Sequence, residues 1–182
     1  KKRKPIKIYA DKITKKHLNN TFSYCFKNSN KEYPAILKMN LIKDKFLIKN
    51  GSKNINVRSI KVEHGKVNSL CYIFDKKLAY ISDVSKIYKK DYRFFKNLKY
   101  LVIDCLWYKN HPSHLNLEQS LELIKIFSPK KAVLTNLHSE LDYEILKKKL
   151  PKNVVPAYDG LNLYFWQIFN FRYNFIGCWA SK

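Results

Sequence analysis

Residues 100–138, which decide the fold, read YLVIDCLWYKNHPSHLNLEQSLELIKIFSPKKAVLTNLH. Tyr100–Ile103 is an uninterrupted apolar run ending at Asp104, which predicts a strand buried on both faces. Leu117–Phe127 repeats apolar residues at helical spacing, and Ala132–Thr135 is a second buried strand. A strand, a helix and a strand in this order predict a βαβ unit within an α/β fold.

The sequence on either side of this unit predicts further strands and helices. Asn116, with Gln119 three residues later, has the pattern of a capping box at the start of the central helix. Asn50-Gly51-Ser52 is typical of a hairpin tip. Strands are expected at residues 5–10, 55–62, 69–74 and 78–81, one helix from an Asp11 cap to about Phe22, and another from a Ser139 cap, with Asp142 as its capping-box partner, to Pro151. The order is mainly β and then βαβα, so we assign the α/β (α+β) class.

Length, hydrophobic content and cysteine spacing limit the class of protein to which this sequence can belong. A chain of 182 residues, 46% of them hydrophobic, is long enough for one domain with a core. It contains neither an apolar run long enough to span a membrane nor a signal region after Lys1, so we expect a cytoplasmic protein without a membrane partner. Its four cysteines form no CxxC pair, which argues against a zinc knuckle and a disulfide framework.

The net charge of +22 comes almost entirely from dispersed lysines. Readers of bases and phosphates favour clustered arginines, so we expect no specific nucleic-acid partner. Weak, salt-dependent binding to polyanions is still expected from the charge alone.

Three polar side chains at the ends of predicted strands are candidate metal ligands. His64 and Asp83 each follow a strand of the first half, and His138 follows the strand that ends at Thr135. In open α/β sheets such ends face a crevice, and imidazole with carboxylate suits zinc or manganese. A single strand-end histidine is more often structural, so the hypothesis depends on the three together. His17, on a lysine-rich helix, is interpreted as a solvated surface residue.

The loop His111-Pro112-Ser113-His114 is the candidate source of a catalytic proton donor. Pro112 restricts the residue before it, and the ordinary pKa of imidazole lies near neutrality. We favour His114 over His111 for this role, and the alternative is that one of them only caps the helix or binds backbone. Asp104 either orients a ligand or satisfies loop amides.

Several short motifs carry a resemblance when taken in order. They are Glu63-His64-Gly65, Tyr80-Ile81-Ser82-Asp83-Val84-Ser85, His111-Pro112-Ser113-His114-Leu115, Leu134-Thr135-Asn136-Leu137-His138 with Leu141-Asp142-Tyr143, and Pro156-Ala157-Tyr158-Asp159-Gly160. This series resembles the PhnP-like branch of the metallo-β-lactamase superfamily, which includes phosphoribosyl 1,2-cyclic phosphate phosphodiesterases. The resemblance covers roughly residues 3 to 163 and implies an αβ/βα sandwich.

The resemblance also implies roles. His64 matches a histidine of the first metal site, Asp83 the carboxylate that bridges two divalent metals (Zn or Mn), His138 the late histidine of the second site, and His114 the histidine that assists cleavage. Many relatives place the late ligand directly after the threonine, where this chain has Asn136. The family's HxHxDH motif, with four more ligands, is absent from this chain, and in the family it lies upstream of the segment that matches Lys1 to Asp11. We therefore expect residues 1–163 to be the C-terminal part of one domain, and this part alone to bind metal weakly and to be inactive.

The implied function is a metal-dependent phosphodiesterase acting on a small-molecule cyclic phosphate ester. Two alternatives stay open: the same fold acting on a thioester, lactone or RNA, or an inactive basic fragment that binds polyanions or protein. The aromatic-rich tail, residues 164–182, is interpreted either as a packed or homodimer-forming extension or as an adventitious terminus.

Overall fold

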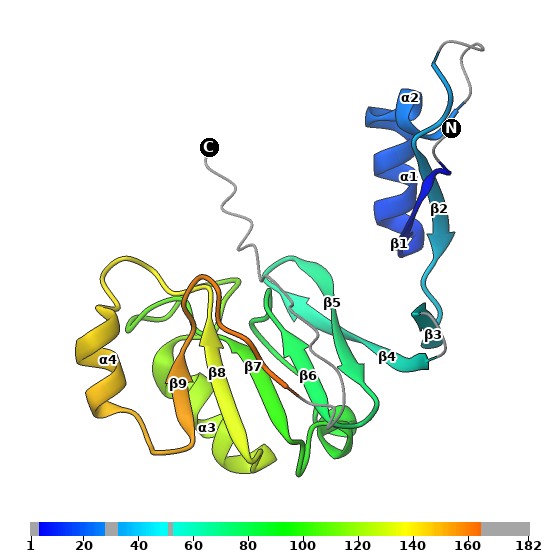
Figure 1. The fold of residues 1–182 in the computed structure, drawn as a ribbon. Helices are drawn as coiled ribbons and strands as arrows, with labels where there is room; N and C mark the ends of the chain where they lie inside the picture. The colour runs from blue at the N-terminus through cyan, green and yellow to red at the C-terminus, as the bar shows by residue number, and fades with distance from the viewer. Residues whose placement is uncertain (1–3, 28–32, 51–52, 165–182) are drawn as a thin grey trace. The chain divides into compact units, whose positions relative to one another are not determined.

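The computed structural model describes residues 4–27, 33–50 and 53–164 (Figure 1). The chain divides into two compact units, Lys1–Phe46 and Leu47–Lys182. The predicted domain over residues 1–163 spans both units, and its unity stays a prediction. Almost all of the predicted tail, residues 165–182, lies outside the described residues, as do Gly51 and Ser52 of the predicted hairpin tip.

The first unit contains a parallel pair of strands joined through two helices. β1 (Ile6–Ala10) pairs with β2 (Leu37–Leu41), and α1 (Lys12–Thr21) and α2 (Ser23–Phe26) lie between them in the chain. Helix α1 begins as predicted, because the Asp11 carboxylate accepts a hydrogen bond of 2.7 Å from the Thr14 amide. No residue of α1 is buried, which agrees with its lysine-rich sequence.

A seven-stranded sheet forms the body of the second unit. In spatial order its strands are β3 (Lys45–Asn50), β4 (Lys53–His64), β5 (Val67–Phe74), β6 (Leu78–Ile81), β7 (Tyr100–Asp104), β8 (Lys131–Thr135) and β9 (Val154–Pro156). The connections contain the 3-10 helix η1 (Lys89–Phe94), α3 (Leu117–Phe127) and α4 (Tyr143–Lys149). The strands and helices predicted from residue 55 to residue 135 are confirmed, including the capping box at Asn116.

Strand direction explains how the sheet positions a site. β4 is antiparallel to β5 and β5 to β6, whereas β6, β7, β8 and β9 are mutually parallel. β4 therefore runs in the same direction as the four parallel strands. The carboxyl ends of all five strands lie at one edge of the sheet, where ligands commonly bind.

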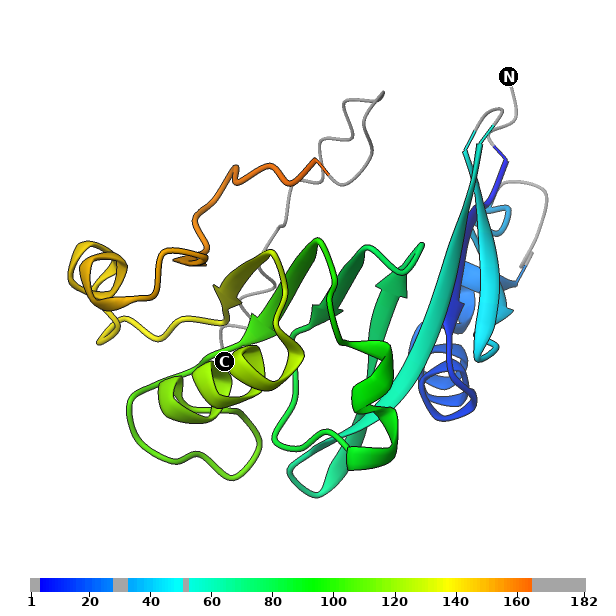
Figure 2. The same cartoon turned by 90° about the horizontal axis from the view of Figure 1, so that it is seen from below.

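Both faces of the central strands are covered, as their apolar sequence predicts. Leu101 and Ile103 pack into the larger core with Phe127 of α3, while Val102 packs into a smaller core with Leu163. Figure 2 shows α3 lying against one face of the sheet. Burial on two faces holds the strand ends rigidly, which is what a precise site requires.

The start of the last helix differs from the prediction. α4 begins at Tyr143, and its cap is Asp142, whose carboxylate accepts a hydrogen bond of 2.8 Å from the Ile145 amide. Ser139 is not the cap, because residues 138–141 form a turn in which the Leu141 amide bonds the His138 carbonyl. Leu141 is buried and fixes this turn, so the helix starts one turn later than predicted.

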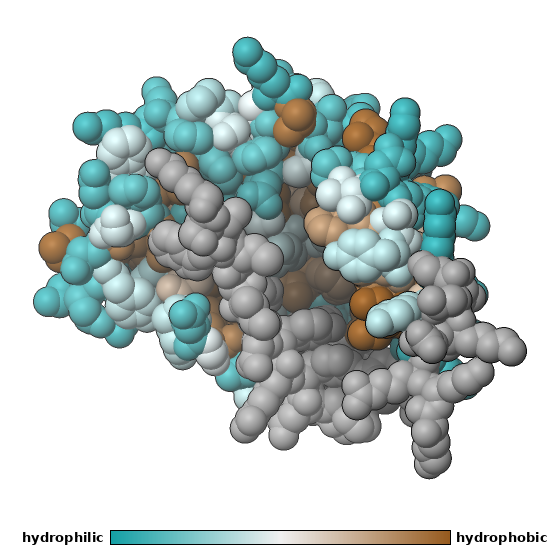
Figure 3. Space-filling model, turned by 90° about the horizontal axis from the view of Figure 1, so that it is seen from above, coloured by the Kyte–Doolittle hydropathy of each residue, from teal (hydrophilic) through white to brown (hydrophobic). Residues whose placement is uncertain are grey.

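The surface agrees with the composition. Figure 3 shows mostly hydrophilic residues on the face seen from above, with a few hydrophobic ones among them. Within the described residues, no helix is both long and apolar enough to cross a membrane.

Candidate metal centre

The shared carboxyl edge of the sheet gathers polar residues from four strand ends. His64 ends β4, Asp83 follows β6 by two residues, Asp104 ends β7 and Asn136 directly follows β8. Parallel strands in register bring such ends side by side, and Asp104 is the β7 partner of Thr135 in the β8 pairing.

Two of these side chains, together with His114 from the loop after β7, have the geometry of a metal site. Among the described residues, one ligand atom each from His64, Asp83 and His114 lie within 4.8 Å of one another. The rings of His64 and His114 meet edge to face with centroids 4.7 Å apart. Two imidazoles and a carboxylate are a donor set that suits a divalent ion such as zinc or manganese, so the residues fit the metal that the resemblance implies.

His64 is oriented by a backbone carbonyl. Its Nδ1 lies 2.7 Å from the carbonyl oxygen of Ser113. Because a carbonyl oxygen only accepts, the ring proton of neutral His64 is on Nδ1, and Nε2 keeps its lone pair. This is the tautomer that binds a metal through Nε2.

Asp83 is held in the turn after β6. The Ser69 hydroxyl donates to its backbone carbonyl, and the Ser82 hydroxyl donates to its carboxylate at 3.0 Å. The side chain is exposed, so its charge is available to a ligand.

His114 is oriented by a fully buried carboxylate. Its Nδ1 lies 2.8 Å from Oδ2 of Asp104, a residue with no exposed surface. The same carboxylate accepts hydrogen bonds from the Val84 amide at 3.2 Å and from the Asn136 side chain at 3.0 Å. Asp104 therefore both orients an imidazole and satisfies a loop amide, the two interpretations that the sequence left open.

Burial has the largest effect on the pKa values of Asp104 and His114. Burial raises the pKa of Asp104 to about 8, the negative charge of Asp83 adds to the rise, and hydrogen bonds from Val84, Asn136 and Leu115 oppose it. A cation bound beside His114 would favour the ionised carboxylate. Burial also lowers the pKa of His114, although the charge of Asp83 acts in the opposite direction. A lowered pKa favours the neutral imidazole, which is the form that binds metals.

His111 lies beside this group but is held differently. Its ring centroid is 5.2 Å from that of His114, and its Nδ1 accepts a hydrogen bond of 3.3 Å from the Ser113 amide. Burial lowers the pKa of His111, and the neighbouring His114 and His64 lower it further. The neutral ring thus carries its proton on Nε2, opposite to His64.

His138 is not in the group of three ligands. Its side chain is exposed, its ring lies 5.4 Å from the Trp107 ring, and its Nδ1 accepts from the Glu140 amide at 3.3 Å. Trp107 in turn donates through Nε1 to the Glu140 carboxylate at 2.7 Å. The metal-binding role of His138 stays a prediction, as do the roles assigned to the other predicted site residues.

Two contributors were missed by reasoning from the sequence. The Ser113 carbonyl has no sequence signature, because every residue has a backbone carbonyl. Gly65 has a signature in hindsight: it directly follows His64, has a φ of +61°, and a Cβ there would lie 3.0 Å from the Ser113 Cβ. Glycine thus permits the turn and the approach of the loop that orients His64.

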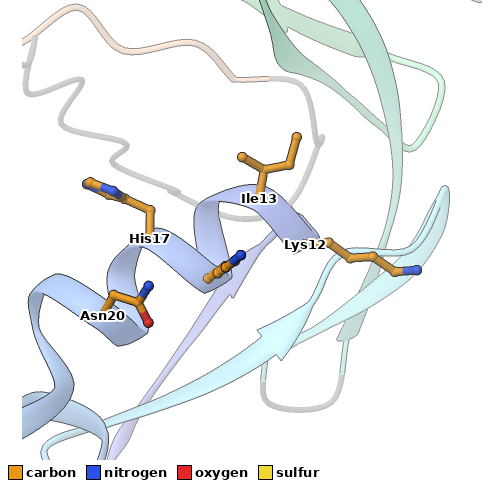
Figure 4. Close-up of a pocket in the computed structure, with 5 residues that line it drawn as sticks. Lys12, Ile13, His17 and Asn20 are labelled. Atoms are coloured by element: carbon orange, nitrogen blue, oxygen red, sulfur yellow. The ribbon is translucent and has the colours of Figure 1, made fainter.

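A hollow lies along α1 in the first unit (Figure 4). It is lined by Lys12, Ile13, Lys16, His17 and Asn20, so its lining has one imidazole and no carboxylate. His17 is exposed, as expected. This hollow lacks the donor set that a metal needs.

Comparisons with known proteins agree on the fold. The family described as "Beta-lactamase superfamily domain" matches residues 1–136. A diphosphatase of the PhnP family, known from a crystal structure, has a TM-score of 0.75 and 25% identity, covering 87% of this chain and 57% of that chain. Zn²⁺-bound PqqB from Methylobacterium extorquens has a TM-score of 0.64 and 13% identity, covering 88% of this chain and 65% of its own.

A curated relative is named octanoyltransferase, from Porphyromonas gingivalis (strain ATCC BAA-308 / W83). It is 27% identical over 157 residues, which are 85% of this chain and 31% of the relative. The chain thus spans about a third of the curated relative and 57% of the PhnP-family structure. The predicted metallo-β-lactamase fold is confirmed, and divalent metals are typical of proteins with this fold. The chain belongs to the beta-lactamase superfamily domain family and has a PhnP-like metallo-β-lactamase fold.

Proposed function

We propose that the protein to which this chain belongs is a metal-dependent hydrolase of a small phosphoester, with a cyclic phosphodiester as the preferred class. The observation that carries this is the convergence of His64, Asp83 and His114 at the carboxyl edge of the sheet. The similarity to a diphosphatase of the PhnP family supports phosphorus as the centre attacked. The sequence motifs, which resemble cyclic phosphate phosphodiesterases, support the diester.

His64 and Asp83 would hold the ion. A divalent ion at this place lowers the pKa of water toward neutrality and offsets charge on phosphoryl oxygens. The resemblance implies two such ions, for both of which Asp83 would be a ligand, and further ligands in an HxHxDH motif that residues 1–182 do not contain. We therefore expect no turnover from these residues alone.

The loop that contains His111 and His114 would supply the donor of a proton or a hydrogen bond in the proposed reaction. Cleavage leaves negative charge on the departing oxygen, and a positioned imidazole donates a proton or a hydrogen bond to it. Because Nδ1 of His111 accepts from the Ser113 amide, its proton is on Nε2. The neutral ring can donate a hydrogen bond from Nε2 to the departing oxygen, and the protonated ring can transfer a proton to it. General acid catalysis of this kind contributes about 10² to 10⁴-fold to the rate.

The test uses the whole gene product, loaded with zinc or manganese and offered bis(p-nitrophenyl) phosphate and a ribose 1,2-cyclic phosphate. We expect hydrolysis of both, and its loss in His64→Ala. Parallel assays offer a small diphosphate, a lactone, a thioester and an RNA, the thioester also because the curated relative is an octanoyltransferase by name. Faster turnover of any of these than of the diesters would overturn the substrate class.

A further inference from the structure

We propose that the amino-terminal edge of the seven-stranded sheet binds the phosphate backbone of single-stranded nucleic acid without reading its sequence. The contact residues are the lysines that precede the parallel strands β6, β7, β8 and β9, namely Lys77, Lys99, Lys130 and Lys152. These four residues are the lysine row. They lie at the opposite edge of the sheet from His64 and Asp83, so the proposal does not depend on the proposed hydrolase activity.

The first support is the register of the strands, which brings lysines that are distant in sequence into line. Leu78 of β6 pairs with Tyr100 of β7, and Tyr100 pairs with Lys131 of β8. Ala132 of β8 pairs with Val154 of β9. Counted back along each strand from these pairs, the four lysines of the row occupy one register position. Figure 1 shows β6, β7 and β8 starting at the same edge of the sheet.

Hydrogen bonds between backbones extend this alignment into the segments before the strands. The Tyr100 amide donates to the Lys77 carbonyl at 3.0 Å, and the Lys131 amide donates to the Lys99 carbonyl at 3.1 Å. Neighbouring strands are about 4.8 Å apart, and a lysine carries its ammonium on a flexible stem. The ammonium groups of the lysine row can therefore each reach a different phosphate of one strand.

The second support is the charge of this edge. Seven lysines and one carboxylate, Asp75, occur in the segments before the four strands, residues 75–77, 96–99, 128–131 and 151–153. Oδ1 of Asp75 accepts from the Asn56 amide at 3.0 Å and from the Asn56 side chain at 3.1 Å. Lys77, Lys130 and Lys152 are exposed. Charge that is dispersed along the sequence is thus collected in one line, where it attracts a chain of phosphates and releases its counterions.

The third support is an exposed aromatic residue beside the row. Nζ of Lys99 donates a hydrogen bond of 2.8 Å to the carbonyl of Tyr164, which is 48% exposed. Proteins that bind single strands without sequence preference combine a basic surface with aromatic rings on which bases stack. A duplex offers phosphates but keeps its bases stacked on one another, so an exposed tyrosine next to the lysines favours a single strand.

The test measures binding of the whole gene product to a fluorescein-labelled oligouridylate by fluorescence anisotropy at several salt concentrations. The row variant combines Lys77→Gln, Lys99→Gln, Lys130→Gln and Lys152→Gln. Each phosphate of a single strand that a lysine neutralises adds about 0.7 to the slope of log affinity against log salt concentration. We therefore expect the row variant to bind more weakly, with a slope smaller in magnitude by about 3.

The matched control removes the same number of charges from exposed lysines elsewhere in the second unit, by Lys61→Gln, Lys66→Gln, Lys89→Gln and Lys90→Gln. We expect its slope to stay close to that of the unaltered protein. Equal losses in the row variant and the control would mean that net charge alone drives binding, and would overturn the proposal. If the row variant melts early, Lys130→Gln with Lys152→Gln replaces it, and about half of the slope change is expected.

Two further ligands identify the chemistry of the partner. Inorganic polyphosphate has phosphates without bases, so Tyr164→Ala should weaken oligouridylate binding about fivefold or more and leave polyphosphate binding unchanged. Equal loss for both ligands, or no loss for the oligouridylate, overturns the choice of nucleic acid. Phosphatidylserine vesicles present negative charge on a membrane, and tighter binding to them than to the oligouridylate also overturns it.

Competition separates the lysine row from the candidate metal centre. A ribose 1,2-cyclic phosphate, the substrate offered in the hydrolase test, should not displace the labelled oligouridylate, because the two edges of the sheet are apart. Displacement would place the oligouridylate at the metal centre and contradict the proposal. Since no turnover is measured, failure of the hydrolase assays leaves the outcome of the binding experiment unaffected.

Discussion

The loops after β7 and after β8 begin side by side at the same edge of the sheet, yet His114 of the first loop and His138 of the second lie in different environments. After β7, Nδ1 of His114 bonds the buried Asp104 carboxylate, and the His114 ring meets the His64 ring edge to face. After β8, His138 is exposed and lies against Trp107. A strand end thus brings a histidine to this edge of the sheet, and the hydrogen-bond partner of its Nδ1 orients the ring.

The largest effect is expected from a substitution that removes the hydrogen bonds holding the loop after β7. Asp104→Ala removes the acceptor of His114, Asn136 and Val84, and each unpaired buried donor costs on the order of 1 kcal/mol or more. We expect the free energy of unfolding, measured by urea denaturation, to fall by about 3 kcal/mol.

The matched variant on the β8 side is Glu140→Ala. It removes a carboxylate that bonds Trp107 and is exposed, so we expect a loss below about 0.5 kcal/mol. Equal losses in Asp104→Ala and Glu140→Ala would show that the two loops are held alike, against the account given above.

A smaller effect is expected where the β7 loop touches the end of β4. Gly65→Ala forces a Cβ into left-handed backbone, at 3.0 Å from the Ser113 Cβ. The left-handed conformation costs about 1 to 2 kcal/mol, and displacement of Ser113 loosens the carbonyl that orients His64. A thermal melt and the Zn²⁺ affinity should both decline. A variant as stable and as tightly metal-binding as the unaltered protein would mean that the approach of the loop is not needed.

The least disruptive check uses two buried cysteines, Cys71 in β5 and Cys105 directly after β7. Burial raises the pKa of Cys105, which follows Asp104, to about 12, with a further rise from the Asp104 charge, and burial raises the pKa of Cys71 to about 12. Both thiols hold their protons more tightly when folded than at their ordinary pKa of 9.0, so the stabilisation is present below pH 9 and is lost as pH rises through about 12.

At pH 8 these two folded thiols therefore contain about a thousandfold less thiolate than ordinary thiols, and iodoacetamide should modify them far more slowly than the half-buried Cys25. Peptide mass spectrometry measures the rates, and the urea-unfolded protein, in which all react, is the control. Rapid modification of Cys105 would show that the base of the β7 loop is open.

Much of the fold could be predicted because the local signals agree with the tertiary structure. The apolar runs at Tyr100–Asp104 and Lys131–Thr135 fit strands buried on two faces, and the Asn116 capping box fixes the start of α3. The start of α4 could not be predicted, because Ser139 and Asp142 are both good caps. The burial of Leu141, a tertiary effect, decides between them.

The candidate site was predictable only in part, for a similar reason. His64 and Asp83 follow from strand ends alone. The environments of His114 and His138 depend on hydrogen bonds between residues distant in sequence: Asp104 with Asn136, and Trp107 with Glu140. No local pattern encodes those pairings.

The central claim, that the carboxyl ends of β4 and β6 hold the metal site, is tested most directly by anomalous diffraction at the zinc edge from crystals of the zinc-loaded gene product. The account predicts a zinc peak bonded to Nε2 of His64 and to the Asp83 carboxylate, at about 2.0 to 2.2 Å from each. Zinc peaks that lie away from both side chains would contradict it.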